Sequence, residues 1–175
     1  MNLKENKIPC FILAGGKSSR FKEDKAKYFY KMQYKICKSI FKHVYFAAKE
    51  KKFKNYPFFI EKSKIYAPIF VLEELIKKHK KIFVINIDTP FVTPKTIKKL
   101  LLKKSVSTQN PLIGYYDYTM LKKLKENKKN NLKIFGINKN NTKINKKEAI
   151  NINKKEELKL YFSDFIRQRR KWNIN

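Results

Sequence analysis

Residues 8–26 read IPCFILAGGKSSRFKEDKA. The first six residues form a short continuous apolar run, which is typical of a strand covered on both faces of a parallel sheet. The run opens directly onto residues 14–16, so we expect a strand followed by a loop. The two glycines of this loop let the main chain approach a phosphate and direct N–H groups at it. Arg20 and Lys25 supply positive charge suited to a polyphosphate.

Outward from this stretch, apolar periodicity predicts strands that alternate with helices. We expect further strands at residues 44–48, 57–60 and 81–87, near 111–115 and at 149–152. We expect helices where apolar residues recur at helical spacing, around residues 36–41, 69–76, 93–101, 120–124 and 158–165. The third of these helices begins at Thr93-Pro94, which combines an N-cap hydroxyl with Pro at the first helical position. Residues 127–147 are rich in Lys and Asn and predict a long surface loop or a weakly ordered edge.

Strands that alternate with helices predict an α/β fold, with a mainly parallel sheet and helices on both of its faces. We find no internal repeat and no linker, so residues 1–175 are expected to form one domain. Sheets of this kind bind ligands beyond the carboxyl ends of their strands. Three polar clusters follow predicted strands: the loop that begins at Ala14, Asp88 after the strand 81–87, and residues 151–153.

The composition excludes several classes of protein. Hydrophobic residues make up 42% of the 175 residues, with only 4 Gly and 6 Pro, which excludes collagen-like, low-complexity and wholly disordered chains. No apolar stretch reaches the ~18 residues of a membrane span, and the first residues lack the apolar core of a signal peptide, so we expect a cytoplasmic protein. Cys10 and Cys37 are expected to be buried thiols in a reducing compartment. His43 and His79 each stand alone and offer neither a nucleophilic triad nor a zinc site.

The net charge of +29, from 43 Lys and Arg against 14 Asp and Glu, suggests a nucleic-acid partner or an anionic surface. Only four of the basic residues are Arg, namely Arg20, Arg167, Arg169 and Arg170. Specific phosphate readers usually carry more Arg, because its planar fork grips phosphate bidentately. We therefore interpret most of the charge as a property of the surface, and our hypothesis is that an AT-rich genome composition produced it. The basic stretch 167–172 is interpreted as a solvated helix end.

The string L-A-G-G-x-S-x-R followed by D-K resembles the signature loop of nucleotidyltransferases, in the version found in the molybdenum cofactor guanylyltransferase (MobA) family. The resemblance implies a three-layer Rossmann-like fold of the nucleotide-diphospho-sugar-transferase type. It also implies a set of loop residues that wrap GTP, which here are Leu13, Ala14, Gly15 and Gly16. Arg20 and Lys25 would contact the GTP phosphates and act as catalytic residues. The alternative for the glycine pair alone is a simple turn.

The segment Ile87-Asp88-Thr89-Pro90-Phe91 resembles the D-x-P-[FY] element of the same family. A carboxylate just beyond a buried strand is a suitable ligand for Mg²⁺, which binds one or two carboxylates together with substrate phosphates and waters. The resemblance implies that Asp88 contacts both GTP and Mg²⁺ and is catalytic. Taken alone, an Asp before Thr-Pro is also an ordinary turn former.

Residues 151–158 resemble the N-x-N-x-x-E-[ED]-L element near the carboxyl end of the family. Alternate residues of a strand share a face, so Asn151 and Asn153 are expected to look into the same site. By analogy both are candidates to contact molybdopterin, and Asn153 is also a candidate second metal ligand. Their alternative roles are strand-end and N-cap positions, where Asn is favoured. Asn110-Pro111 matches a further segment of the family in part, and there a structural strand is the favoured interpretation.

Two stretches depart from the family pattern. Phe21-Lys22 stand where the family usually has Met-Gly, and residues 67–71 read A-P-I-F-V where it commonly reads G-P-L-x-G near the guanine. The polar positions that help to hold the nucleoside align roughly with Ala47, Lys49 and Lys62, which are not equivalent. The sequence therefore indicates that phosphate handling is retained while base selection is altered.

The resemblance implies transfer of GMP from GTP to molybdopterin, with Mg²⁺ as cofactor and release of pyrophosphate. Residues 1–103 would bind the nucleotide and residues 104–175 the acceptor. GTP and molybdopterin are the implied substrates, and molybdopterin-handling or molybdoenzyme-maturation proteins are the implied partners, with no membrane contact. One alternative is a nucleotidyltransferase of altered specificity that uses CTP or another phosphorylated acceptor. A second alternative is a basic nucleic-acid-binding protein on a degenerate α/β scaffold.

Overall fold

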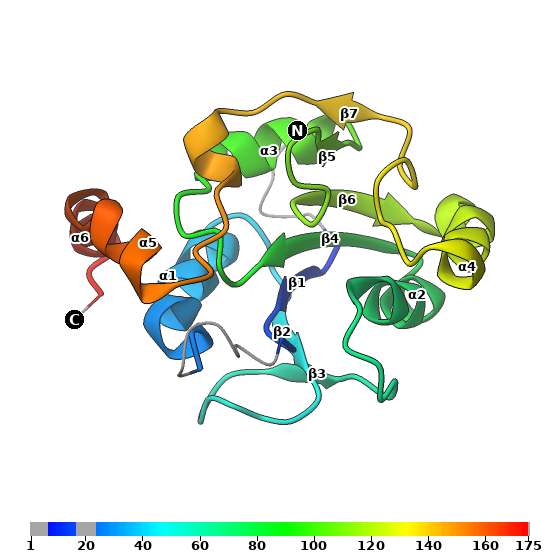
Figure 1. Cartoon of the computed structure of the whole chain (residues 1–175), viewed down its shortest axis with the longest axis horizontal. Coiled ribbons are helices and arrows are strands. Elements are labelled where there is room, and N and C mark those ends of the chain that lie inside the picture. Colours follow the sequence, from blue (N-terminus) through cyan, green and yellow to red (C-terminus); the bar gives the residue numbers. More distant parts are fainter. Residues whose placement is uncertain (1–6, 17–23, 175) are drawn as a thin grey trace.

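The computed structural model describes residues 7–16 and 24–174, and these residues contain one seven-stranded sheet with the order β3-β2-β1-β4-β6-β5-β7 (Figure 1). Its strands are β1 (Cys10–Leu13), β2 (Val44–Ala48), β3 (Phe58–Ile60), β4 (Lys81–Asn86), β5 (Val106–Ser107), β6 (Gly114–Asp117) and β7 (Asn141–Thr142). The α-helices are α1 (Ala26–Lys38), α2 (Pro68–His79), α3 (Pro94–Leu102), α4 (Leu121–Asn130), α5 (Lys155–Leu160) and α6 (Phe162–Lys171). The part of the chain that the structure describes also contains the short 3₁₀-helices η3 (Tyr118–Met120) and η4 (Lys146–Ala149).

β1 is buried on both faces, because alternate residues of a strand point to opposite sides of the sheet. Cys10 and Ile12 pack in a core with residues of α1, α3 and α6. Phe11 and Leu13 pack in a second core with residues of α2 and α4. Figure 1 shows these two groups of helices on opposite sides of the sheet. The predicted α/β fold with helices on both faces is therefore confirmed.

The sheet is mainly parallel, as predicted. β1 pairs in parallel with β2 on one edge and with β4 on the other, and the register places Leu13 opposite Asn86. β6 is antiparallel to both β4 and β5. Because β1 and β4 run in the same direction, the loops that follow Leu13 and Asn86 leave the sheet side by side.

Two predicted strands are placed differently in the structure. The strand expected near residues 111–115 begins only at Gly114, because residues 110–113 form a turn in which Asn110 Oδ1 accepts a hydrogen bond from Leu112 N. The strand expected at residues 149–152 is wrong: η4 occupies residues 146–149, and the Ile152 N–H then donates to the main-chain oxygen of Asp88 at 2.8 Å. That N–H therefore bonds to a loop and not to a neighbouring strand.

The predicted Lys/Asn-rich loop and the predicted last helix are each divided in the structure. Residues 127–147 begin inside α4 and include β7, which pairs with β5 at one edge of the sheet. Ile137 is buried and fastens this segment to the core beside α2 and α4. The predicted C-terminal helix is two helices, α5 and α6, which meet at Tyr161. α3 begins as predicted, with the Thr93 side chain accepting a hydrogen bond from Thr96 N.

Both cysteines are buried free thiols, as predicted. Burial raises the pKa of Cys10, and the neighbouring Cys37 on α1 adds to that effect. Among the described residues, no helix has the length and apolar composition of a membrane span.

We predict that Gly114→Ala destabilises the protein, because a Cβ at this position would lie 2.5 Å from the Cα of Val106 in the paired strand β5. Main-chain crowding of this kind cannot be relieved by rotating a side chain, so the free energy of unfolding should fall by about 1–3 kcal/mol. Urea denaturation measures this change. Gly16→Ala is the matched control, since a Cβ there meets no atom within 4 Å. Equal stability of the two variants would contradict the prediction.

Candidate functional site

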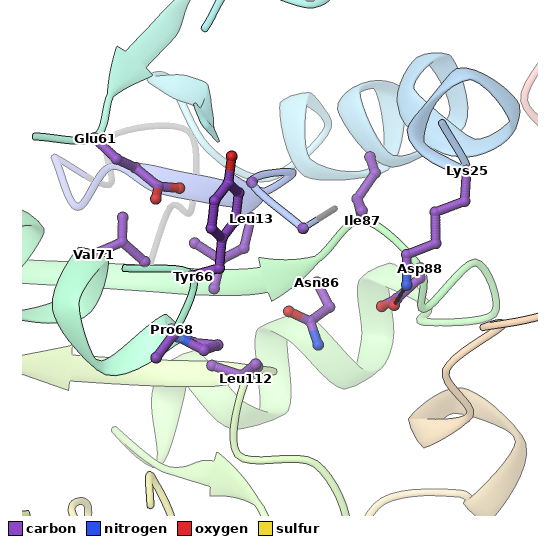
Figure 2. Close-up of a pocket in the computed structure, with 13 residues that line it drawn as sticks. Leu13, Lys25, Glu61, Tyr66, Pro68, Val71, Asn86, Ile87, Asp88 and Leu112 are labelled. Atoms are coloured by element: carbon purple, nitrogen blue, oxygen red, sulfur yellow. Dashed lines mark hydrogen bonds and ion pairs between the residues drawn. The ribbon is translucent and has the colours of Figure 1, made fainter. Parts of the chain in front are cut away.

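A cavity of about 210 Å³ lies where the carboxyl ends of β1 and β4 meet (Figure 2). Of the residues that the sequence singled out, its wall contains Leu13, Gly15, Gly16, Lys25 and Asp88. The wall is completed by Glu61, Tyr66, Ala67, Pro68, Val71, Asn86, Ile87 and Leu112. The ligand-binding edge expected for a parallel sheet is therefore the edge that carries the cavity.

Lys25, at the start of α1, joins two of the predicted polar clusters. Its ammonium group donates to Asp88 Oδ2 at 2.5 Å and to Asn153 Oδ1 at 3.0 Å. The side chains of Lys25 and Asp88 are only 15% and 10% exposed, so their ion pair is largely shielded from water. Residues that lie 63 and 128 positions away in the chain thus converge on one cation.

The loop that carries Asp88 is fixed by hydrogen bonds from distant segments. The fully buried Gln33 of α1 donates through Nε2 to Thr89 O at 2.6 Å and to Asn86 O at 3.4 Å. Thr89 Oγ1 donates to Asn86 O at 2.8 Å, and Ile152 N donates to Asp88 O. Asp88 therefore occupies a preorganised position, with little freedom of its main chain.

Asn153 reaches the site through its hydrogen bond with Lys25, whereas Asn151 contacts Asn110, and neither asparagine lines the cavity or lies on a strand. The Asn153 N–H donates to Glu157 Oε2 at 2.6 Å and the Lys154 N–H donates to the same oxygen at 3.2 Å, which holds this segment at the start of α5. Asn151 Oδ1 accepts a hydrogen bond from Asn110 Nδ2 at 2.9 Å. Asn110 is buried, so the partial sequence match at this position marks a residue that positions Asn151.

The donor set around Asp88 fits a divalent cation. Within residues 7–16 and 24–174, Asp88 Oδ1 is one of the buried side-chain oxygens with no hydrogen-bond partner. Asp88 Oδ2 and Asn153 Oδ1 already converge on the Lys25 cation, and carboxylate and amide oxygens are ligand types that Mg²⁺ accepts. The part of the chain that the structure describes contains no group of three or more His, Cys, Asp or Glu side chains that could hold a metal ion. A metal here would therefore need oxygens from a substrate or from water as well.

The opposite end of the cavity is apolar apart from the Glu61 carboxylate and the Tyr66 hydroxyl. Figure 2 shows Glu61 and Tyr66 at this end, with Lys25 and Asp88 at the other. Burial raises the pKa of Glu61, and the charge of Lys49, whose Nζ lies 3.6 Å from Glu61 Oε2, opposes that rise. The cavity thus has a polar end with a cation and a carboxylate, and an apolar end with a second carboxylate.

Some predicted residues lie elsewhere. Arg20 and the departure Phe21-Lys22 fall outside the described residues. Ala14 is buried, and its N–H donates to Ala47 O at 2.8 Å, so this N–H already has a main-chain partner. The sequence reasoning did not find Glu61 or Gln33. A lone acidic residue directly after a predicted strand was the available signal for Glu61, and nothing local marks Gln33.

Known proteins resemble this chain over the segment that carries the cavity. The sequence model of the MobA-like NTP transferase domain matches residues 10–111, which include β1, β4 and most of the cavity wall. The chain belongs to this family. A molybdenum cofactor guanylyltransferase from Campylobacter jejuni is 34% identical over 132 residues, which cover 63% of this chain and 69% of that protein. A probable molybdenum cofactor guanylyltransferase from Aquifex aeolicus is 33% identical over 176 residues, which cover 86% and 88% of the two chains.

A solved structure of a putative protein from Aquifex aeolicus has the same fold as this MobA-like NTP transferase domain. The two structures superpose with a TM-score of 0.68 at 30% identity, over 85% of this chain and 95% of the other. The family match includes residues 67–71, where the sequence departs from the usual glycines. In this MobA-like domain Ala67 is extended and Pro68 begins α2, so the altered stretch is a helix start that lines the cavity.

We predict that Gln33→Met loosens the loop that carries Asp88, because Thr89 O loses its buried donor while the side-chain volume is nearly kept. The free energy of unfolding should fall by about 1–3 kcal/mol, the usual cost of leaving a buried polar group without a partner. Hydrogen exchange at the amides of Ile87 and Thr89 should become faster.

Asn138→Leu is the matched control, because the buried Asn138 donates to Tyr115 O at 2.8 Å away from the cavity wall. It should cost similar stability and leave exchange at Ile87 and Thr89 unchanged. Unchanged exchange in Gln33→Met would show that Gln33 does not position this loop.

Proposed function

We propose that this protein transfers GMP from GTP to molybdopterin, forming molybdopterin guanine dinucleotide and releasing pyrophosphate. Membership of the MobA-like NTP transferase family supports the proposal, as do relatives named molybdenum cofactor guanylyltransferase. The observation that carries it is the convergence of Lys25, Asp88 and Asn153 beside the glycine loop. This convergence brings all three polar clusters together at the carboxyl ends of the parallel strands, which is where sheets of this kind bind ligands.

The nucleotide phosphates bind at the polar end of the cavity in this proposal. The N–H group of Gly16 is suited to a phosphate oxygen, because glycine allows close approach of the main chain and no other atom lies within 4 Å of the position its Cβ would take. Lys25 and Arg20 supply positive charge that stabilises the pyrophosphate leaving group. Asn151, which accepts a hydrogen bond from Asn110 Nδ2, is the residue that would contact the pterin acceptor.

Asp88 and Asn153 are the residues that would hold Mg²⁺. When bound, the metal would supply charge neutralisation on the nucleotide phosphates. Asp88 offers Oδ1, which has no partner among the described residues, and Asn153 offers the oxygen that now accepts from Lys25. Lys25, released from those oxygens, would be free to pair with a phosphate.

The reaction needs positioning and charge neutralisation more than covalent help from the protein. An oxygen of the terminal phosphate of molybdopterin attacks the α-phosphorus of GTP, and a new phosphoanhydride bond forms. The bond from the α-phosphorus to the oxygen that bridges to the β-phosphate breaks, and its electron pair leaves with pyrophosphate. No general base is needed, since the attacking phosphate is already ionised.

We predict that the protein releases pyrophosphate when it is incubated with GTP, Mg²⁺ and molybdopterin, and that Asp88→Asn and Lys25→Ala each lower the rate by about 100-fold or more. The physical reason is the loss of a charge that is used while negative charge moves between phosphates. A coupled assay for pyrophosphate measures the rate. Asp117→Asn is the matched control, because Asp117 lies opposite Lys81 in the register of β6 with β4, at the amino end of β4, and its carboxylate caps η3.

Asp117→Asn should retain the wild-type rate. Absence of pyrophosphate with folded protein and verified substrates would overturn the proposal, and so would release from CTP in place of GTP. Full activity of Asp88→Asn would remove Asp88 from the mechanism.

A further inference from the structure

The carboxylate of Glu61 lines the cavity at the end opposite Lys25 and Asp88. Glu61 follows β3 directly, and its side chain lines the cavity with only 9% exposure. Its carboxylate lies against the glycine loop so closely that a Cβ at Gly15 would be 2.5 Å from Glu61 Oε1. Glycine at this position therefore makes room for the carboxylate at the start of the nucleotide-binding loop.

The surrounding segment holds Glu61 in place. The Glu61 N–H donates to Ala48 O at 2.9 Å, which continues the pairing of β2 with β3. The next two N–H groups, those of Lys62 and Ser63, each donate to a different oxygen of Glu74 at 3.0 Å. Glu74 belongs to α2, so the main chain that carries Glu61 is tied to both sides of the cavity. The main chain that carries the carboxylate is thus preorganised before any ligand binds.

The partners of the Glu61 carboxylate leave acceptor capacity unused. Lys49 is the cation beside it, at 3.6 Å from Oε2, and Lys49 also donates to the main-chain oxygens of Ser63 and Ile65. An ionised carboxylate offers about four lone-pair sites and no donor. A ligand that enters this end of the cavity would meet an acceptor that is carried by a well-held main chain and is only partly occupied.

The walls beside Glu61 suit a flat heteroaromatic ring. Leu13, Pro68 and Val71 give apolar surface, and the ring of Tyr66 lies next to the carboxylate in Figure 2. Lys25 and Asp88 lie at the opposite end of the same cavity. A nucleotide with its phosphates beside Lys25 would therefore direct its base toward Glu61.

We propose that Glu61 is the residue that selects guanine, by accepting hydrogen bonds from the N1–H and the 2-amino group of the base. Guanine is the common nucleobase with two adjacent donors on its pairing edge. Adenine and cytosine present an amino group beside a ring-nitrogen acceptor, which a carboxylate repels. This inference rests on the proposed transfer from GTP, and it names a residue that replaces the base contacts altered at Lys62 and at residues 67–71.

The test compares binding of GTP with binding of inosine triphosphate, which lacks the 2-amino group. The binding is measured by isothermal titration calorimetry with the full chain, in Mg²⁺ and without acceptor. For the wild type, the Kd of inosine triphosphate should be about tenfold or more higher than the Kd of GTP, because inosine triphosphate lacks one hydrogen bond to a charged group. In Glu61→Gln the ratio should fall to about 1, because its amide donor opposes a base donor. Glu61→Asp keeps the charge and should keep part of the preference.

Glu73→Gln is the matched control, because the Glu73 side chain is also 9% exposed but pairs with Lys77 and Lys128 and is absent from the cavity wall. It should lower stability and leave the ratio unchanged. A wild-type preference for GTP that persists undiminished in folded Glu61→Gln would overturn the role of Glu61 and leave the proposed reaction standing. Binding of CTP in preference to GTP by the wild type would overturn the proposed reaction itself.

Discussion

The two-sided burial of β1 is the constraint on which the site depends. The four residues of β1 are all apolar and all buried, and both edges of the strand are hydrogen bonded to parallel neighbours. The position of β1 fixes its register and direction relative to β4. The loop after Leu13 must therefore leave the sheet beside the loop after Asn86. Lys25 follows the first loop and Asp88 lies in the second, and their ion pair is a consequence of the pairing.

The local part of this arrangement was predictable from the sequence. The apolar run at residues 8–13 and the run at 81–87 predicted two buried strands, and parallel strands carry ligands at their carboxyl ends. Gly15, Gly16, Lys25 and Asp88 all line the resulting cavity, as that reasoning requires. What periodicity could not supply was the antiparallel direction of β6, which depends on how the chain crosses the sheet after α3.

The non-local part was harder to predict because its determinants are single hydrogen bonds between distant residues. The strand expected at residues 149–152 failed because Ile152 N–H bonds to Asp88 O, and no local pattern marks that choice. The resemblance of residues 151–158 to the family element nevertheless singled out Asn153, which the structure joins to Lys25 by a hydrogen bond. A family motif can single out such a residue even where the local apolar pattern cannot. Gln33 was missed for the same reason: its importance lies in acceptors 53 and 56 residues away.

Two buried carboxylates, Glu61 and Glu73, differ in how far neighbouring lysines compensate for their burial. Glu61 and Glu73 both have side chains that are 9% exposed, yet their pKa values move in opposite directions. Burial acts to raise the pKa of Glu73, but close hydrogen bonds from Lys128 and Lys77 outweigh it and lower the pKa.

For Glu61 burial raises the pKa and prevails, because Lys49 is the nearest ion-pair partner and lies at 3.6 Å. Close hydrogen bonds from lysine are what lower the pKa of a buried carboxylate such as Glu73. Glu73 has two such neighbours and joins α2 to α4, which accounts for its position by structure alone. Glu61 lies in the cavity wall, and Lys49 compensates only partly for the burial of its carboxylate. A hydrogen-bond donor on a ligand would therefore stabilise this carboxylate more than one that is already well paired.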